Sequence, residues 1–395
     1  MRGTLLRTRV IARAVLGAVL AVAASALAVA PPPEFTYVEM PDHVKIAISI
    51  AYPDGFSADD VDEWPALFQM DGYGGGGDVL NPASWGDGYV MVYASIRGTG
   101  CSGGRFDLFD RVHAEDGWRV IESFIVAQPW SNGDVGIIGH SYPGLTGWMV
   151  ASTNPPSVKA IAISGLIDDL YRGIVYPGGV PNYGFPAVWT LGARPALELA
   201  GNYDRYVNET TSADPTCLES IAARPPRDVA DDPVVQGATS REDETWWQMR
   251  STITWIGGIQ KPIHITQQYQ DEQTGPRGGH VLFQRIPDSI PKRLVVTNGV
   301  HSTTGIAHAD RRAWLDCHVR GVCTGDIDDP TKRVRLHFET KDGPVVNPPP
   351  TSRATGRCRR PSGRAITCAP TAPSPGRRPE ARRHGATSRP RRAGS

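Results

Sequence analysis

The sequence predicts an α/β protein whose mostly parallel β-sheet carries helices on both faces. Two observations support this prediction. Between residues 65 and 164, short apolar segments that suit buried strands alternate with a segment of helical periodicity. After a long stretch without such segments, two more apolar strands are expected at 262–267 and 293–297. The interruption indicates that an inserted, largely helical cap divides the core.

The period of the apolar residues predicts the individual elements. Residues 37–52 alternate with period two, which predicts a strand with one buried face. Residues 114–128 carry an apolar stripe at helical spacing that includes Trp118 and Ile121. Residues 332–339 alternate again, and we expect them to begin a β domain. Further strands are expected at 65–70, 89–96, 159–164, 262–267 and 293–297, and a final helix at 310–319.

The segment 134–147 organises the predicted site. The apolar run Val135–Ile138 ends at Gly139, and Ser141 follows two residues later. A strand, a tight turn and a helix in this order would lift the serine off the end of a buried strand and expose its hydroxyl. This is the nucleophile elbow of the α/β-hydrolases, although Gly144 stands one place later than in the usual motif.

A serine nucleophile needs a base for its proton and a carboxylate that holds the base. In α/β-hydrolases the order along the chain is serine, acid, histidine, each on a loop after a strand. Asp271 follows the strand at 262–267, and His301 follows the next strand. Alternatives remain open: Glu272 for the acid and His280 or His308 for the base, whereas His264, inside a strand, is expected to pack in the core.

Several motifs occur in order along residues 37–340. They are the glycine-rich loop 71–77 with Tyr73, the turn Arg97–Gly104, the helix stop Gln128–Gly133, the elbow Gly139–Gly144, and the loops Asp271–Gly275 and Asn298–His301. Together they resemble the cocaine esterase / X-prolyl dipeptidyl-peptidase family of hydrolases. That family's elbow is Gly-x-Ser-Tyr-x-Gly, which accounts for the late glycine.

The resemblance implies a role for each site residue. Ser141 would be the nucleophile, His301 the general base and Asp271 the carboxylate that orients it. The backbone N–H of Tyr142 and the hydroxyl of Tyr73 would form the oxyanion hole. Both donors would then face the negative charge that develops during acyl transfer.

The charge of the chain is unevenly distributed. Residues 31–350 carry 25 basic and 40 acidic residues, which gives no support for binding nucleic acid or an anionic membrane. Residues 351–395 carry twelve arginines and one acid, with almost no large apolar residue. This basic tail is expected to be disordered. A frameshift near Ala354 is our hypothesis for its composition.

Residues 1–28 are expected to be a Sec-type signal peptide. A basic segment with four arginines precedes an apolar stretch of small residues. Cleavage after Ala28 is favoured, because cleavage after Ala30 would leave Pro31 at the new N-terminus. We therefore expect secretion, with cell-envelope association as an alternative, and no stable membrane insertion after cleavage. An uncleaved membrane anchor is the competing interpretation.

Six cysteines in an exported chain favour disulfides. Cys317 and Cys323 are close in sequence, and a local bridge between them is the first expectation. The pairing of the remaining cysteines is left open, and their spacing does not resemble a zinc site.

These segments define the expected domains. The family that the chain resembles has a C-terminal jelly-roll domain, of which only the start is expected here. The expected domains are a signal peptide (1–28), a first α/β-hydrolase core segment (29–167), a helical cap (168–250), a second core segment (251–325), the start of a truncated β jelly-roll domain (326–350) and the disordered basic tail (351–395).

We therefore expect an exported serine hydrolase that cleaves ester or amide bonds, Xaa-Pro peptide bonds among them, through an acyl-enzyme and without a metal or other cofactor. Its partner would be a small-molecule ester or amide, or a peptide. An apolar pocket could be lined by Trp189, Trp246, Trp247 and Trp255, which could equally form the core of the cap. No carboxylate pair that would hold a peptide amine can be placed in the cap. The alternative is a catalytically impaired or binding-only truncated chain of the same fold, and the oligomeric state is not predicted.

Overall fold

The computed structural model describes residues 30–74, 81–197, 214–226, 233–239, 242, 244–340 and 343–346. These residues lie in the unit Met1–Asn347. The expected signal peptide, part of the glycine-rich loop and the tail 351–395 lie outside the described residues.

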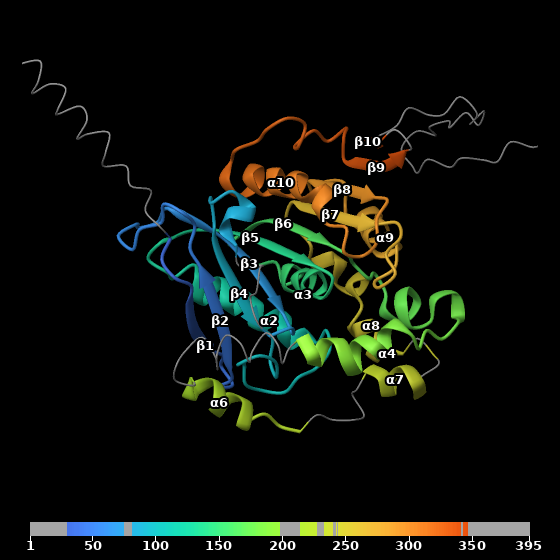
Figure 1. The fold of residues 1–395 in the computed structure, drawn as a ribbon, viewed down its shortest axis with the longest axis horizontal. Helices are drawn as coiled ribbons and strands as arrows, with labels where there is room; N and C mark the ends of the chain where they lie inside the picture. The colour runs from blue at the N-terminus through green and yellow to red at the C-terminus, as the bar shows by residue number, and fades with distance from the viewer. Residues whose placement is uncertain are drawn as a thin grey trace, which may run out of the picture. The chain divides into compact units, whose positions relative to one another are not determined.

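The described residues form a ten-stranded sheet in the order β1-β2-β4-β3-β5-β6-β7-β8-β9-β10 (Figure 1). The strands from β4 to β9 in this order run parallel to one another. β1, β2 and β10 are antiparallel to their neighbours at the two edges. The strands are β1 Glu34–Glu39, β2 Lys45–Ala51, β3 Trp64–Asp71, β4 Val90–Ser95, β5 Ser131–His140, β6 Val158–Ser164, β7 Ile263–Gln268, β8 Lys292–Thr297, β9 Val334–Thr340 and β10 Gly343–Val346.

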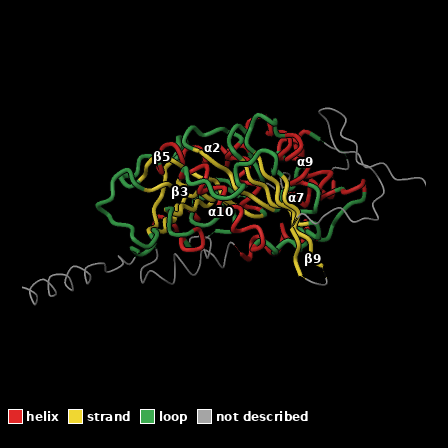
Figure 2. Tube along the Cα trace, turned by 90° about the horizontal axis from the view of Figure 1, so that it is seen from above, coloured by secondary structure: helices red, strands yellow, loops and turns green. Residues whose placement is uncertain are grey.

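Helices connect and cover these strands, as the parallel sheet requires. The α-helices are α2 Arg111–Arg119, α3 Tyr142–Ala151, α4 Phe185–Val188, α6 Pro215–Ala222, α7 Pro233–Thr239, α8 Thr245–Met249, α9 Gly278–Arg285 and α10 His308–Arg320. The 3₁₀ and π segments are η2 Pro82–Trp85, η3 Val120–Ile125, η4 Tyr171–Val175, η5 Pro177–Gly179, η6 Trp189–Ala193, η9 Thr252–Gly258 and η10 Gly305–Ala307. The predicted α/β-hydrolase fold is confirmed, with the strands gathered among helices and loops (Figure 2).

The two faces of the central strands pack against different helices. On β5, Ile137 belongs to the larger apolar cluster, which includes residues of α3. Ile138, the next residue, belongs to the second cluster, with Trp314 and Leu315 of α10. Gly136 lets α10 approach closely, because a Cβ atom there would lie 2.9 Å from the Leu315 side chain. Successive residues of one strand thus fix both helices around the carboxyl end of β5.

The segment 37–52 differs from the prediction of one strand with one buried face. It forms two antiparallel strands, β1 and β2, joined by a turn in which the Met40 N–H donates to the Val44 carbonyl. His43 has a φ of 63° in this turn. β2 lies between β1 and β4, and its side chains are buried on both faces. The alternation of side chains continues on both sides of the turn, so the period alone did not reveal the turn.

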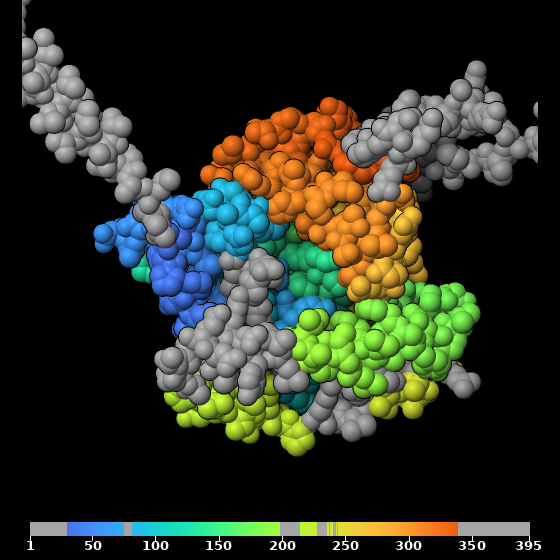
Figure 3. Space-filling model, in the orientation of Figure 1, coloured from blue at the N-terminus to red at the C-terminus, as the bar shows by residue number. Residues whose placement is uncertain are grey.

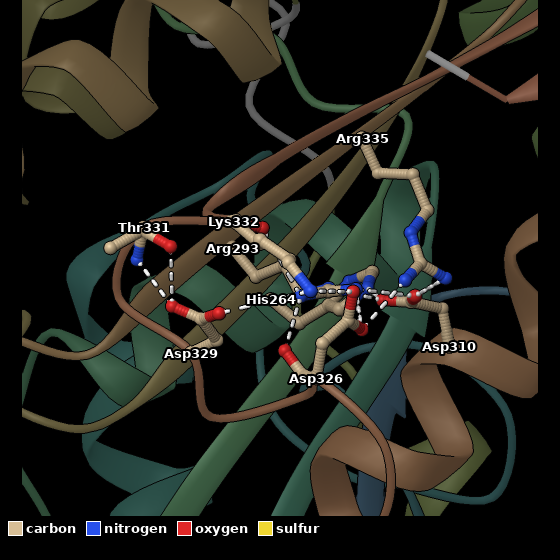
Figure 4. Close-up of polar contacts among 8 residues, drawn as sticks. All are labelled: His264, Arg293, Asp310, Asp326, Asp329, Thr331, Lys332 and Arg335. Carbon is tan, nitrogen blue, oxygen red and sulfur yellow. Dashed lines mark hydrogen bonds and ion pairs between the residues drawn. The ribbon is translucent and has the colours of Figure 1, made fainter.

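The strand expected to begin a β domain is β9, which pairs parallel to β8 and so extends the main sheet. A buried ionic network helps to hold it there (Figure 4). Asp310 of α10 accepts from His264 at 2.9 Å and from Arg293 at 2.7 Å, and it pairs with Arg335 of β9 at 2.7 Å. These contacts join β7, β8, β9 and α10 around one carboxylate.

The described residues between 168 and 250 form short helices and no strand. In Figure 3 their green segment lies beside the yellow and orange atoms of the second core segment. A disulfide joins Cys217 of α6 to Cys101, in the loop after β4, and the expected bridge between Cys317 and Cys323 is confirmed. In the part of the chain that the structure describes, every helix is too short or too polar to cross a membrane.

Candidate active site

Ser141 occupies the turn between β5 and α3. Its φ of 63° and ψ of −127° are strained for a residue with a side chain. The turn has room only for glycine at positions 139 and 144. A Cβ atom at Gly139 would lie 2.3 Å from the carbonyl oxygen of Pro143, and a Cβ atom at Gly144 would lie 2.6 Å from the carbonyl oxygen of Ser164. The turn therefore has the geometry of the predicted nucleophile elbow.

Asp271 and His301 form a pair at the ends of β7 and β8. Nδ1 of His301 lies 3.0 and 2.9 Å from the two carboxylate oxygens of Asp271. Thr274 donates to the same carboxylate from its backbone N–H and its hydroxyl, each at 2.7 Å. Although burial raises the pKa of Asp271, the hydrogen bonds from His301 and Thr274 hold it below its ordinary value. The carboxylate is thus charged at neutral pH and keeps the imidazole proton on Nδ1.

The structure gives the competing residues other partners. Glu272 accepts the backbone N–H of His301 at 3.1 Å, so it supports the loop and not the ring. His264 is buried in β7 against Asp310, as expected of a core residue. The Nε2 atom of His308 lies 2.6 Å from the Ser84 carbonyl oxygen. His280, the last alternative, lies on α9, whereas His301 is the histidine that meets Asp271.

Ser141 and the His301 ring converge on the end of β6. The Ser141 N–H donates to the Ser164 carbonyl at 2.9 Å. A Cβ atom at the next residue, Gly165, would lie 3.2 Å from Cε1 of His301. Because β5, β6, β7 and β8 are parallel neighbours, their carboxyl ends bring the serine, the histidine and the aspartate to one edge of the sheet.

Tyr73, just after β3, also reaches this edge. Its side chain interacts with that of Ser141. Nε1 of Trp189 donates to the Tyr73 hydroxyl oxygen at 3.0 Å, which leaves the tyrosine's own proton able to donate into the site. Burial raises the pKa of Tyr73 to about 12, so the hydroxyl keeps that proton at neutral pH. The Tyr142 N–H belongs to the first turn of α3, where backbone donors lack intrahelical partners.

The contact from Trp189 to Tyr73 was not predicted from the sequence. The two residues are 116 positions apart, and no motif or spacing connects them. The tryptophan was expected only as a pocket or core residue. In the structure, Trp189 donates to the Tyr73 hydroxyl, and it also packs edge-on against Tyr142, with 5.1 Å between the ring centroids.

An apolar pocket opens beside Ser141. Trp189 and Trp247, two of the four tryptophans considered, line it. The other two are covered by arginines: Arg250 lies over Trp246 and a second arginine over Trp255. The described lining residues are uncharged and include Leu108, Phe109, Leu145, Ile167, Leu170, Ile174, Phe185 and Thr274. The pocket thus suits an apolar, uncharged group next to the serine hydroxyl.

A serine on a strained strand-to-helix turn, with an acid–histidine pair after later strands, places the chain in the class of α/β-hydrolase folds. The model of the X-Pro dipeptidyl-peptidase (S15) family matches residues 42–303. The match covers more than half of the sequence, and the chain belongs to this family.

Named relatives agree with this assignment. The chain is 30% identical over 271 residues to a cocaine esterase from Rhodococcus sp. (strain MB1 Bresler), covering 60% of this chain and 45% of the relative. It is 29% identical over 182 residues to an Xaa-Pro dipeptidyl-peptidase from Streptococcus pneumoniae (strain Hungary19A-6), covering 45% of this chain and 22% of the relative. The chain thus spans less than half the length of these two relatives.

Solved structures share the fold. A CocE/NonD family hydrolase from Staphylococcus aureus superposes with a TM-score of 0.62 at 22% identity, covering 80% of this chain and 55% of that chain. An α-amino acid ester hydrolase superposes with a TM-score of 0.55 at 18% identity, covering 80% and 58%. At these identities the likeness concerns the fold alone.

Proposed function

We propose that this chain is an exported serine hydrolase that cleaves esters or amides of apolar, uncharged acyl groups. The observation that carries the proposal is the site at one edge of the sheet. Ser141 faces an apolar pocket from a strained turn, and the nearby His301 is bound to a buried, charged Asp271. A serine hydroxyl, an oriented imidazole and a carboxylate are the groups that acyl transfer needs.

In the proposed reaction, His301 takes the proton of the Ser141 hydroxyl as its oxygen attacks the acyl carbonyl. The new oxyanion accepts hydrogen bonds from the Tyr142 N–H and the Tyr73 O–H, each typically worth about 3 kcal/mol in the transition state. The imidazolium then gives its proton to the leaving alcohol or amine, and an acyl-enzyme remains. Water repeats the sequence with the same base and releases the acid.

The lining of the pocket favours acyl esters or amides over Xaa-Pro peptides. A dipeptidyl-peptidase must hold the positive amine of the peptide, which needs a carboxylate close to the bound substrate. The described lining residues carry no charged side chain, and most of them are apolar. Peptidase action by one of the named relatives therefore does not transfer directly to this pocket.

The test compares three substrates on purified full-length chain: a short-chain activated ester, an aromatic activated ester and an Xaa-Pro anilide. We expect both esters to be hydrolysed at least about tenfold faster, as kcat/KM, than the anilide, since the anilide's charged amine would enter an uncharged pocket. Ser141→Ala should abolish turnover and leave the thermal unfolding curve unchanged. Faster anilide cleavage would reverse the substrate assignment, and turnover by folded Ser141→Ala would refute the mechanism.

Export is proposed from the sequence of residues 1–28 and is supported by the two disulfides, which form in oxidising compartments. Expression with the native N-terminus should yield mature protein in the culture medium, beginning after Ala28. Intact protein confined to the cytosol, with residues 1–28 retained, would contradict this part of the proposal.

A further inference from the structure

His140 and Ser164 end the neighbouring strands β5 and β6, where they are register partners. Their side chains meet, with His140 Nδ1 2.9 Å from Ser164 Oγ. Arg311 of α10 reaches the same oxygen, and its Nη1 donates to Oγ at 3.4 Å. A polar chain therefore runs from a buried arginine, through a serine hydroxyl, to the residue directly before the proposed nucleophile.

His140 lies in turn against His301. Their ring centroids are 4.5 Å apart, with 39° between the ring planes. Both rings converge on Gly165, where a Cβ atom would lie 2.9 Å from Cε1 of His140 and 3.2 Å from Cε1 of His301. Only a residue without a side chain leaves room for the two rings at this place, so His140 limits where the His301 ring can stand.

We propose that His140 is a positioning residue for the general base: fixed by Ser164 and Arg311, its ring holds the His301 imidazole in line with the Asp271 carboxylate. The inference rests on the proposed function, because it assigns His140 a role only through His301. It also explains why polar groups are buried behind the elbow, where an apolar side chain would fill the same space.

The surroundings of the His140 ring keep it uncharged. A guanidinium can only donate, so Arg311 uses one lone pair of Ser164 Oγ, and the other lone pair or the hydroxyl proton of Ser164 meets Nδ1 of His140. Burial lowers the pKa of His140 to about 3, and the positive charges of His301 and Arg311 act in the same direction. His140 thus remains uncharged when His301 takes up a proton, and the new charge stays beside Asp271.

Two variants test the proposal, and a third variant serves as a matched control. His140→Phe keeps an aromatic ring but cannot form a hydrogen bond with Ser164, and Ser164→Ala removes the hydroxyl that joins Arg311 to His140. The control is His113→Phe, since His113 is also a buried histidine on the described part of the chain, both of its ring nitrogens lack a hydrogen-bond partner there, and it does not line the pocket. All three should be compared for kcat, KM, thermal unfolding and the downfield proton NMR resonance of the His301–Asp271 hydrogen bond.

We expect His140→Phe and Ser164→Ala to lower kcat by about tenfold with KM changed less than about twofold, because a misplaced base weakens the transition state and not substrate binding. The downfield resonance should shift or broaden in both, whereas His113→Phe should keep the wild-type kcat and resonance. If His140→Phe does not fold, the smaller Ser164→Ala change carries the test. Unchanged kcat and an unchanged resonance in folded Ser164→Ala would overturn the inference.

The two proposals fail in different ways. Turnover by Ser141→Ala would remove the proposed mechanism and the positioning role with it. Loss of turnover in Ser141→Ala, together with wild-type kcat in His140→Phe and Ser164→Ala, would leave the mechanism intact and refute only the role of His140.

Discussion

The replacement Tyr73→Phe isolates one donor of the proposed oxyanion hole. It removes the hydroxyl that lies near Ser141 and keeps the ring, which packs edge-on against Tyr142 at 5.3 Å between centroids. One preorganised donor is typically worth about 10²–10³ in kcat. We therefore expect kcat to fall by about that factor while KM changes little.

The same change costs little stability. Nε1 of Trp189 loses its acceptor, and the loss of one such hydrogen bond typically destabilises a protein by about 1 kcal/mol. The assay is steady-state hydrolysis of an activated ester, with urea unfolding measured in parallel. Tyr89→Phe is the control, because it removes a hydroxyl that donates to Asp316 at 2.9 Å, away from the pocket. It should lower stability and leave kcat unchanged.

An outcome in which Tyr73→Phe retains kcat within about threefold would refute the reasoning, since a donor to the oxyanion contributes far more than that. The tyrosine would then be a packing residue that the Trp189 indole happens to contact. A loss of kcat that appears equally in Tyr89→Phe would point to a general effect of stability and would also count against the assignment.

Three further changes probe the elbow, the acid and the ionic network. Asp271→Asn should reduce kcat by about 10⁴, as measured by ester hydrolysis, because an amide favours the wrong tautomer of His301; activity within tenfold of wild type would exclude this aspartate. Gly139→Ala should abolish activity, because its Cβ would lie 2.3 Å from a carbonyl oxygen, whereas Gly257→Ala, with nothing within 4 Å of the new atom, should be neutral in the same assay. Asp310→Asn should cost about 3–5 kcal/mol in urea unfolding at neutral pH, since it removes the nearer carboxylate partner of the buried Arg293 and leaves it only the longer ion pair with Asp326, at 3.3 Å. Burial raises the pKa of Asp310, but hydrogen bonds from its histidine and arginine partners outweigh burial and hold it below the ordinary value. The stability that Asp310 contributes is therefore present above the ordinary aspartate pKa and is lost as the pH falls through its lowered pKa. The free energies of unfolding of wild type and variant should then converge in acid. A difference in stability that does not change with pH would contradict this.

The parts of the site that follow strands could be predicted from the sequence. Ser141, Asp271 and His301 each come just after an apolar segment, and parallel strands end at one edge of a sheet. The place of His301 on a loop directly after a strand favoured it as the base, with His280 and His308 as alternatives. The structure adds the contact between His301 and Asp271, which spacing alone does not give.

The supporting contacts could not be predicted, because each joins residues far apart in the chain. Trp189 meets Tyr73 across 116 positions, and Arg311 meets Ser164 across 147. The pairing of β9 with β8 was not predicted, for a different reason. The alternating pattern of β9 is the same whether it begins a separate domain or extends the existing sheet, and the ionic contacts of Arg335 that favour the sheet depend on the folded chain.

The most direct test of the central claim is covalent labelling of the purified full-length chain with a fluorophosphonate, followed by mapping of the modified peptide. If the three side chains form a working triad, one label should be found on Ser141, it should disappear in Asp271→Asn at short reaction times, and it should be absent from Ser141→Ala. A folded chain that takes up no label, or that carries the label on another serine, would contradict the proposed mechanism and leave only the fold.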